Sequence, residues 1–350
     1  MNAAAKELTV TPSSNRILQK ILDTTRESVL VVDADMRIVG SNSPAVETFG
    51  RGSDLEGKRL SEAVRDLDLH EAFRRAIFSN ASSEVRLELN NADRRFDVHV
   101  APLELDGDTQ AIGFFYETTK IERLESIRQE FLSNISHELR TPLTSILAFV
   151  ETLEDGALDD TENNRRFLGV IRRNAERMHS LIADILELSL IESGKVSVET
   201  RPVHVGVLTD EIFASLTAKA NDREVKLFND IDKSVTVIAD NVRLEQMLVN
   251  LIDNAIKFNR VGGSVTVTHR RHEEMDVISV IDAGEGIMPE HLGRIFERFY
   301  RVDRARSREI GGTGLGLAIV KHLARLHGGE VSVRSVLSEG TTFQIELPAH

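Results

Sequence analysis

Short runs of alternating hydrophobic and polar residues fill the first third of the chain. The segment SVLVVDADMRIVGSN is typical of two strands around the Asp-rich turn at Asp33 to Asp35. Three more strand-like runs follow in SEVRLELNNADRRFDVHVAPLELDGDTQAIGFFYET, joined at NNAD and at DGD. The segments PAVETFG and LHEAFRRAIF, which lie between these two groups, have helical spacing. Together they predict a small α+β domain with an antiparallel sheet over residues 16–117.

From about Glu117 to Val150 the spacing becomes that of one long helix. At about 100° per residue, its apolar side chains form one stripe within about 60° of Ile135. The stripe consists of Ile121, Leu124, Phe131, Leu132, Leu139, Ile146 and Val150. A second helical pattern spans Thr161–Ile191, and the short connection EDGALDD predicts that the two helices are antiparallel neighbours. Because each stripe is buried poorly by one partner, we expect a dimeric four-helix bundle.

From about Pro202 onward, strand-like and helical segments alternate. The strand-like segments are SVTVIAD, GSVTVTHRR, DVISVIDAG, GEVSVRS and TTFQIELP, and the helical ones span Asn241–Phe258 and Leu315–His327. This alternation predicts a separate α/β domain over residues 197–350. The predicted organisation is therefore a tail at 1–15, the α+β domain at 16–117, a helical region at 118–196 and this α/β domain.

The amino-acid composition excludes some classes of binding partner and some kinds of chemistry for this chain. The 350 residues, 41% of them hydrophobic and 28% charged, suffice for two or three globular domains. The net charge of −13 argues against nucleic acid as the main partner, because phosphate backbones bind basic surfaces. The absence of cysteine excludes disulfides, thiolate metal sites and cysteine nucleophiles. No apolar run approaches the roughly 18–20 residues needed to cross a bilayer, and the N-terminus has no apolar core like that of a signal peptide. We therefore expect a soluble, cytoplasmic chain without membrane contact of its own; a membrane anchor upstream is compatible with this.

The first long helix carries one histidine and one proline in FLSNISHELRTPL. His137 lies about 200° from Ile135, opposite the apolar stripe, and Thr141 shares its outer face. A zinc-binding helix does not fit, because Thr141 stands where such a motif needs its second histidine. Pro142 lacks the amide that would bond the carbonyl of Glu138, which loosens or bends the helix there. An exposed imidazole beside a carboxylate is compatible with a nucleophile, but from its position alone a surface or capping histidine is the default interpretation.

Polar side chains of the last domain occur in patterns that suit a nucleotide. In NLIDNAIKF, Asn250, Asn254 and Lys257 share one helical face. Two carboxamides and an ammonium are suitable partners for Mg²⁺-bridged phosphates. Asp282 ends a strand in DAGEGI, where Gly284 allows the backbone to approach a planar ligand, as does Gly286 in the same turn.

Two further segments favour anions. GGTGLGLAIV is a glycine-rich turn that opens a helix, and the free amides at a helix start favour phosphate. RFYRVDRARSR is a basic segment in an acidic protein; its arginines are Arg298, Arg301, Arg304, Arg306 and Arg308. Each element alone is more often an ordinary turn or solvated loop. Their combination in one domain predicts nucleotide binding.

The segments FLSNISHELRTPL, NLIDNAIKF, DAGEGI, RIFERFYR and GGTGLGLAIV resemble the H, N, G1, F and G2 boxes of sensor histidine kinases. They occur in that family's order, and their residues are most similar to those of phosphate-regulon-type sensor kinases. The first domain resembles a PAS sensor, although it ends in Glu117-Thr118-Thr119 where such domains have Asp-Ile-Thr. The resemblance implies a multidomain fold: an α+β PAS-like sensor, a dimeric antiparallel four-helix bundle and an α/β sandwich ATP-binding domain of the GHKL type.

The resemblance also implies an activity. His137 would be the phosphoacceptor for ATP, Glu138 its general base, and the phosphoryl group would pass to an aspartate of a response regulator. Thr141 would position water for dephosphorylating that regulator. The chain would act as a homodimer.

In the ATP-binding domain, Asn254 would help to hold Mg²⁺ and Asp282 would accept a hydrogen bond from the adenine amino group. The residues implied near the phosphates are Asn250, Lys257 and Arg301. The glycines implied in the nucleotide turn and in the hinges of a mobile lid are Gly284, Gly286, Gly312, Gly314 and Gly316.

Two other interpretations remain open. An ATPase of the same architecture usually has a water-activating glutamate where this chain has Asn250, and a scaffold would bind nucleotide without transferring phosphate. For the sensor domain, the absence of cysteine excludes a flavin–cysteine adduct. His70 or His99 would have to hold any haem, and an ordinary structural role is the preferred interpretation of both. The stimulus, the identity of the regulator and the choice between transfer within or between protomers are left open.

Overall fold

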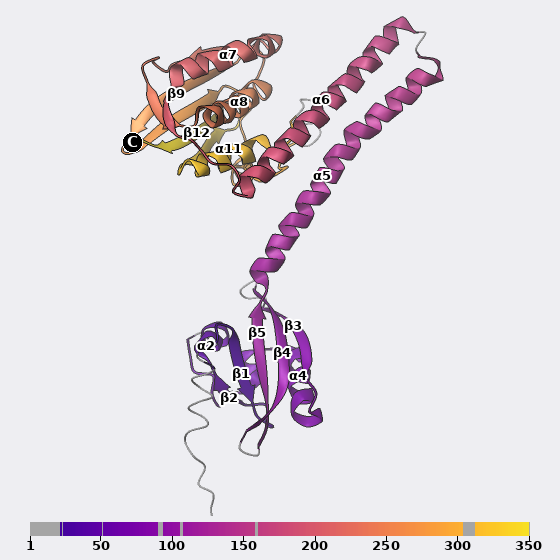
Figure 1. The fold of residues 1–350 in the computed structure, drawn as a ribbon, viewed down its shortest axis with the longest axis vertical. Helices are drawn as coiled ribbons and strands as arrows, with labels where there is room; N and C mark the ends of the chain where they lie inside the picture. The colour runs from indigo at the N-terminus through magenta and orange to yellow at the C-terminus, as the bar shows by residue number, and fades with distance from the viewer. Residues whose placement is uncertain are drawn as a thin grey trace, which may run out of the picture. The chain divides into compact units, whose positions relative to one another are not determined.

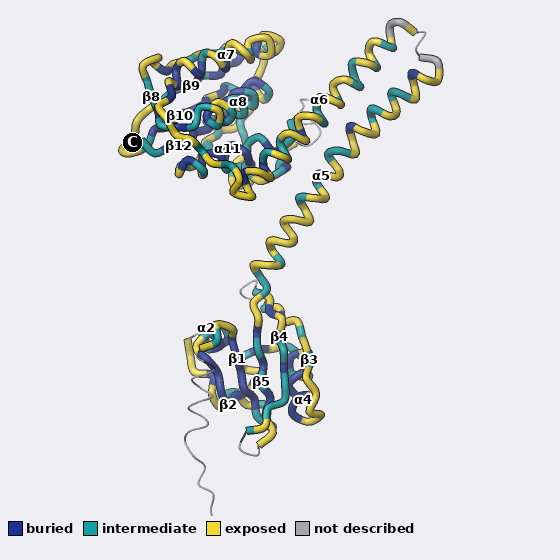
Figure 2. Tube along the Cα trace, in the orientation of Figure 1, coloured by how far each residue is buried: buried dark blue, intermediate teal, exposed yellow. Residues whose placement is uncertain are grey.

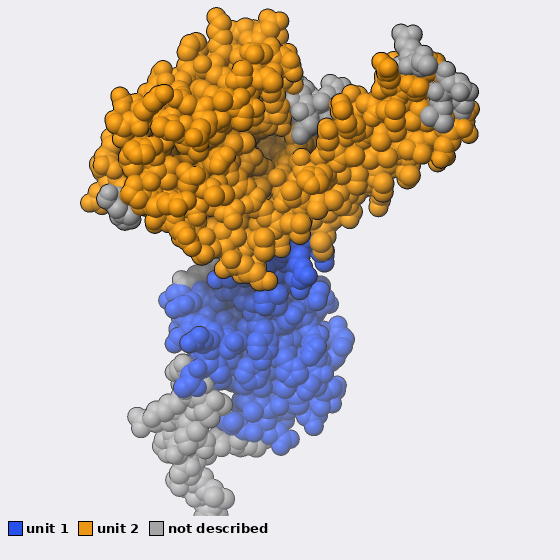
Figure 3. Space-filling model, turned by 45° about the horizontal axis from the view of Figure 1, so that its top comes forward, with its two compact units in different colours: residues 1–130 blue, residues 131–350 orange. Residues whose placement is uncertain are grey.

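A computed structural model describes residues 22, 24–50, 52–89, 94–105, 108–157, 160–303 and 312–349. The chain divides into two compact units, residues 1–130 and 131–350 (Figure 3). Their boundary falls inside helix α5, Thr119–Thr152. The predicted tail at 1–15 and the arginines at 304, 306 and 308 lie outside the described residues, and the predicted domain borders stay predictions. Within the described part of the chain, no helix combines the length and apolarity that a bilayer crossing requires.

The first unit is built on one five-stranded antiparallel sheet in the order β2-β1-β5-β4-β3. Its strands are β1 Ser28–Val32, β2 Ile38–Ser41, β3 Ser83–Leu89, β4 Arg94–Leu105 and β5 Asp108–Glu117. The helices of this unit are α2 Ser43–Phe49, α3 Leu60–Ala63 and α4 Leu67–Ser79. The predicted α+β domain with an antiparallel sheet is therefore confirmed.

The interior of this unit is packed with aromatic side chains. The ring of Phe49 lies 4.8 Å from that of Phe115 and 5.8 Å from that of Phe96, and all three are buried. His99 points its Nδ1 toward a carboxylate oxygen of Glu84, 3.9 Å away, and its side chain is 43% exposed. His70 has a ring nitrogen 3.2 Å from the carbonyl of Val64. Neither histidine belongs to the buried core, so the haem interpretation gains no support.

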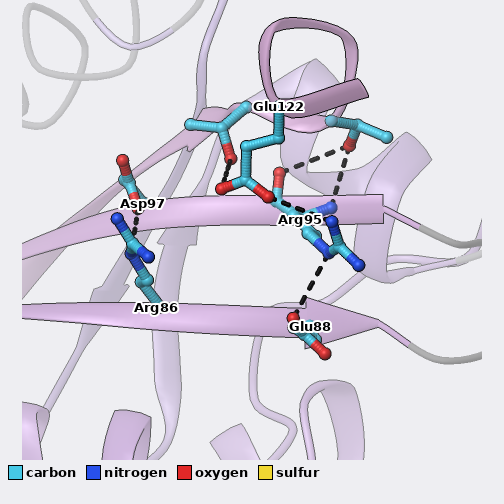
Figure 4. A network of polar contacts seen from close by, with 7 residues as sticks. Arg86, Glu88, Arg95, Asp97 and Glu122 are labelled. Atoms are coloured by element: carbon cyan, nitrogen blue, oxygen red, sulfur yellow. Dashed lines mark hydrogen bonds and ion pairs between the residues drawn. The ribbon is translucent and has the colours of Figure 1, made fainter. Parts of the chain in front are cut away.

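The start of α5 is tied to strand β4 by polar contacts, most of which Figure 4 draws. Arg95 donates one guanidinium N–H to Glu122 at 3.1 Å and lies 3.2 Å from Glu88 on β3. Its backbone amide donates to the hydroxyl of Thr119 at 2.8 Å, and Glu117 pairs with Arg94 at 2.5 Å. The Glu-Thr-Thr segment thus forms an ordered sheet-to-helix junction although it departs from Asp-Ile-Thr.

Helices α5 and α6, Thr161–Glu192, form an antiparallel hairpin through the π-helical turn Leu153–Ala157 (Figure 1). The side-chain amide of Asn174 donates to the hydroxyl of Ser145 at 3.3 Å. The rings of Phe149 and Phe167 are tilted against each other with 5.3 Å between their centroids. The partners run in opposite directions, which confirms the predicted arrangement. Helix α5 continues through the buried Pro142.

Much of this hairpin is exposed (Figure 2), and its exposed residues include many large apolar ones. On α5 they are Ile121, Leu124, Ile127, Leu132, Leu143 and Leu147, and on α6 they are Leu168, Ile182, Leu186 and Leu190. Phe131, Ile135 and Leu139 are instead partly buried against the core of the second unit. The predicted stripe is therefore divided between an inner contact and an exposed face.

The C-terminal part of the second unit is a sheet covered by helices. The sheet has the order β11-β12-β10-β9-β7, and a separate pair joins β6 to β8. The strands are β6 Arg201–His204, β7 Lys226–Asn229, β8 Thr236–Ala239, β9 Ser264–His272, β10 Met275–Asp282, β11 Glu330–Val336 and β12 Gly340–Pro348. The helices are α7 Val205–Asp222, α8 Asn241–Lys257, α9 Pro289–Leu292 and α11 Gly316–Leu326. Helix α8 packs against α7, α11 and strand β10, which confirms an α/β sandwich.

Helix α7 is the main element that the sequence pattern did not predict. Its residues Val205, Leu208, Ile212 and Phe213 are buried. The segment is rich in β-branched and aromatic residues, which lower helix propensity. Packing against α8 outweighs that propensity.

Candidate functional site

A cavity of about 880 Å³ opens in the second unit, between α6 and the helices and loops of the α/β domain. Most of the predicted site residues line it: Asn250, Asn254, Lys257, Asp282, Gly286, Arg301, Gly312, Gly314 and Gly316. Gly284, His137, Glu138 and Thr141 are not among its lining residues. The fold thus brings the segments predicted to bind nucleotide into one cavity.

Helix α8 presents its polar face to this cavity because its opposite face is buried. Asp240 caps the helix by accepting from the amide of Arg243 at 3.1 Å. The buried face consists of Leu244, Met247, Leu248, Leu251, Ile252, Ala255 and Ile256. Asn250, Asn254 and Lys257 therefore lie together at the cavity wall, as predicted.

Asp253, on the same helix, lines the cavity but was not predicted as a site residue. One of its carboxylate oxygens lies 2.7 Å from the ammonium of Lys257, and the other bonds Lys219 of α7. Burial raises the pKa of Asp253, but the charge of Lys257 and the bond from Lys219 outweigh burial and lower it. The wall thus carries an ionised acid shared by two lysines.

Asp282 ends strand β10 and is only 9% exposed. Its Oδ1 accepts from the amide of Gly284 at 2.9 Å and from that of Thr341 at 3.2 Å. No donor among the described residues bonds its Oδ2. Burial raises the pKa of Asp282 to about 6, although both amides oppose this change. The site therefore holds a buried acid with one oxygen available to a ligand.

The two glycines after Asp282 allow close packing of the protein on itself. Gly286 has a φ of +73°, and a Cβ there would lie 2.2 Å from the carbonyl oxygen of Val336. A Cβ on Gly284 would lie 2.6 Å from the carbonyl oxygen of Phe258. Contacts with the chain's own backbone thus require both glycines, and their close approach to a ligand stays a prediction.

The glycine-rich turn leads into α11, whose first turn lines the cavity. Gly314 has a φ of +76°, and a Cβ on Gly316 would lie 3.0 Å from the side-chain oxygen of Asn250. The hydroxyl of Thr313 donates to Asp184 of α6 at 2.7 Å. Burial raises the pKa of Asp184 in spite of that bond. The turn is therefore anchored to α6 through Thr313 and packs closely against α8 at Gly316.

The phosphoacceptor candidates lie on α5. His137 is exposed, and Thr141 is exposed one turn later, where its hydroxyl donates to the carbonyl of His137 at 3.1 Å. Glu138 accepts from the guanidinium of Arg177 on α6 at 2.9 Å and from that of Arg301 at 3.0 Å. The side chain of Arg301 is only 5% exposed. The structure thus joins the helix that carries the histidine to an arginine of the cavity wall.

Further contacts hold α6 against the α/β domain. Arg243 and Gln246 both donate to Glu187, while Glu192 pairs with Arg298 and lies 3.5 Å from His322. Leu181, Leu188 and Ile191 of α6 belong to the buried core of this unit. Sequence reasoning missed these partners because they come from distant segments. Asp253 and Thr313, in contrast, stand inside the recognised motifs.

Comparison with known proteins identifies three domains. Residues 239–350 match the family described as histidine kinase-, DNA gyrase B-, and HSP90-like ATPase. Residues 127–194 match the His Kinase A (phospho-acceptor) domain, and residues 22–123 match the PAS fold.

The chain is also similar to sensor proteins of Staphylococcus aureus. Sensor protein SrrB of Staphylococcus aureus strain MRSA252 is 30% identical over 342 residues, which are 96% of this chain and 56% of that protein. SrrB of strain N315 is 29% identical over 341 residues, with the same coverage. The chain therefore spans little more than half the length of these relatives.

Solved structures share the fold. Histidine kinase AdeS of Acinetobacter baumannii is 23% identical with a TM-score of 0.52, and the match covers 61% of this chain and 98% of that one. Histidine kinase ThkA, solved in complex with response regulator protein TrrA, is 22% identical with a TM-score of 0.54, covering 95% and 98%. With its three matched domains and these relatives, the chain belongs to the sensor histidine kinases of two-component systems.

Proposed function

We propose that this chain phosphorylates His137 from ATP and passes the phosphoryl group to an aspartate of a response regulator. One observation carries the proposal: Glu138, the neighbour of His137, is bonded at 3.0 Å by Arg301 of the cavity wall. The candidate phosphoacceptor helix and the candidate ATP site thus belong to one packed unit, and transfer needs the two to come close together.

The cavity has the chemistry of an adenine nucleotide site. Asp282 offers Oδ2 as an acceptor for the adenine amino group, and the first turn of α11 offers amides to phosphate. Asn250 and Lys257 line the same cavity. Asn254 is positioned to supply a carboxamide oxygen to Mg²⁺, which when bound would neutralise phosphate charge.

The proposed chemistry uses His137 as the nucleophile. A ring nitrogen forms a bond to the γ-phosphorus while the bond from that phosphorus to the bridging oxygen of ADP breaks, and ADP leaves. The proton on the other ring nitrogen passes to the carboxylate of Glu138. Arg301 stabilises the charge on the transferred group. The Arg301 contact with Glu138 would have to rearrange as ATP binds.

The partner would be a separate response regulator. The structural neighbour ThkA was solved with such a regulator, which supports the same class of partner here. Thr141 is exposed one turn from His137, so its hydroxyl is available to orient water for dephosphorylating the regulator. Phosphatase activity is therefore part of the proposal.

A homodimer is the proposed assembly. The exposed leucines of the α5–α6 hairpin form an apolar surface that a second hairpin would bury in a four-helix bundle. Because the proposed activity depends on ATP and on a response regulator, we propose that the chain works in the cytoplasm.

An ATPase without phosphotransfer is the less favoured function. Asn250 stands where ATPases of this architecture usually place a water-activating glutamate, and its carboxamide cannot take a proton from water. A scaffold that binds nucleotide without phosphotransfer is also less favoured, because His137 is exposed and its neighbour contacts the cavity wall.

The test is incubation of the purified chain with Mg²⁺ and ATP labelled at the γ-phosphate. We expect acid-labile, base-stable label on the unchanged chain and none on His137→Gln. His179→Gln is the matched control, because His179 is an exposed histidine of α6 and should leave labelling unchanged. Label that persists in His137→Gln contradicts the proposal, as does ATP binding without any label.

A further inference from the structure

Three charged side chains meet at one wall of the nucleotide cavity. Lys257 and Asp253 are one turn apart on α8, and Lys219 comes from α7, outside every recognised motif. Lys257 lies 2.7 Å from Oδ2 of Asp253, while Lys219 bonds Oδ1. All three residues line the cavity. The two lysines therefore share one carboxylate without competing for the same oxygen.

These three side chains are partly shielded from solvent. The side chains of Asp253 and Lys257 are 19% and 14% exposed, whereas that of Lys219 is 45% exposed. Arg223 donates to the backbone carbonyl of Lys257 at 2.6 Å, which holds the end of α8 in place. Charges at such a site are weakly screened, so their balance affects any anion in the cavity.

We infer that Lys219 is a positioning residue that keeps Lys257 available to the phosphates of the nucleotide. The inference rests on the proposed function. With Lys219 present, its ammonium group, that of Lys257 and the carboxylate of Asp253 together carry one net positive charge. Asp253 stays paired with Lys219 when Lys257 turns toward phosphate. An incoming nucleotide therefore does not leave the partly buried carboxylate of Asp253 without a positively charged partner.

Loss of Lys219 would remove this net positive charge. Asp253 would then have Lys257 as its remaining lysine partner, and this pair would be neutral. Moving Lys257 to the phosphates would leave Asp253 uncompensated close to another anion, which is costly at a partly buried site. The same argument predicts that Lys219 loses its importance once Asp253 is made neutral.

The experiment is a double-mutant cycle on ATP affinity with the full chain. We expect Lys219→Gln to raise the Kd for ATP about tenfold. In the Asp253→Asn background, the same change should raise it less than about twofold. Lys219→Arg keeps the charge and the carboxylate bond, so it should bind ATP like the unchanged chain.

Two controls separate positioning from folding and from general charge. Adenosine lacks phosphates, so its Kd should not change in Lys219→Gln if the site is intact. Lys233 pairs with Asp210 and is 76% exposed outside the cavity lining, and Lys233→Gln should leave ATP binding unchanged.

The inference is overturned if Lys219→Gln binds ATP normally, or if it weakens adenosine equally. An equal loss in both Asp253 backgrounds also overturns it, because Lys219 would then act independently of Asp253. Failure of the unchanged chain to bind ATP refutes the proposed function, and this inference with it.

Discussion

At the residue scale, the raised pKa of Asp282 predicts that nucleotide binding depends on pH. Burial raises its pKa to about 6, so the carboxyl is mostly neutral below that pH and mostly ionised above it. The ionised form is the better acceptor for the adenine amino group. We therefore expect ATP affinity to rise as pH increases through about 6 and then to level off. Between pH 5 and pH 7 the gain should be at most about tenfold.

Titration calorimetry of ATP binding between pH 5 and pH 7.5 checks this expectation. The γ-phosphate of ATP titrates in the same range, so Asp282→Asn is measured in parallel to remove that contribution. We expect the variant to bind more weakly than the unchanged chain at pH 7 and to show a flatter profile. Identical pH profiles for the two proteins would show that Asp282 does not contact the base.

At the element scale, the junction between β4 and α5 links the sheet of the first unit to the long helix. Arg95 joins Glu88 of β3 to Glu122 in the first turn of α5 (Figure 4). Such partly exposed pairs contribute about 0.2–1 kcal/mol each. Glu122→Gln should therefore raise hydrogen exchange at the start of α5 by up to about fivefold.

The matched control lies on the same sheet. Arg86 and Asp97 form a cross-strand pair at 3.5 Å that does not include α5. Asp97→Asn should leave exchange in α5 unchanged, as measured by mass spectrometry of the full chain. Equal effects of the two substitutions would show that the sheet responds as a whole and that Arg95 is not a specific link.

At the scale of the whole molecule, the exposed leucines of the hairpin predict its assembly. Leu147 of α5 is 54% exposed and Leu186 of α6 is 61% exposed, although both are large apolar residues of long helices. Burying one leucine contributes about 1.5–3 kcal/mol, and a symmetric dimer buries each position twice. Leu147→Glu should therefore weaken dimerisation at least about 100-fold.

Sedimentation equilibrium over a range of concentrations measures this change. Leu67→Glu is the control, because Leu67 is 88% exposed on α4 of the first unit and does not belong to the hairpin. It should leave the dimer intact. A monomeric unchanged chain at micromolar concentration, or a dimer unaffected by Leu147→Glu, would rule out the bundle.

Local periodicity accounts for what the sequence predicted well. The long helices, the five antiparallel strands of the first unit and the later strands each follow a pattern of residues close together in the chain. The polar face of α8 was predictable because the step of seven positions from Asn250 to Lys257 spans two helical turns. Helix α7 escaped prediction because its stability depends on packing against α8, which no local pattern records.

The sequence by itself therefore determined the elements, the motifs and the side chains that share a helical face. Only the tertiary structure decided that Arg301 bonds Glu138, that Asp184 holds Thr313 and that Lys219 shares Asp253 with Lys257. These partners are far apart in the chain, and their pairing depends on how whole elements pack. It also decided the raised pKa of Asp282, because desolvation comes from the residues that surround a group in space.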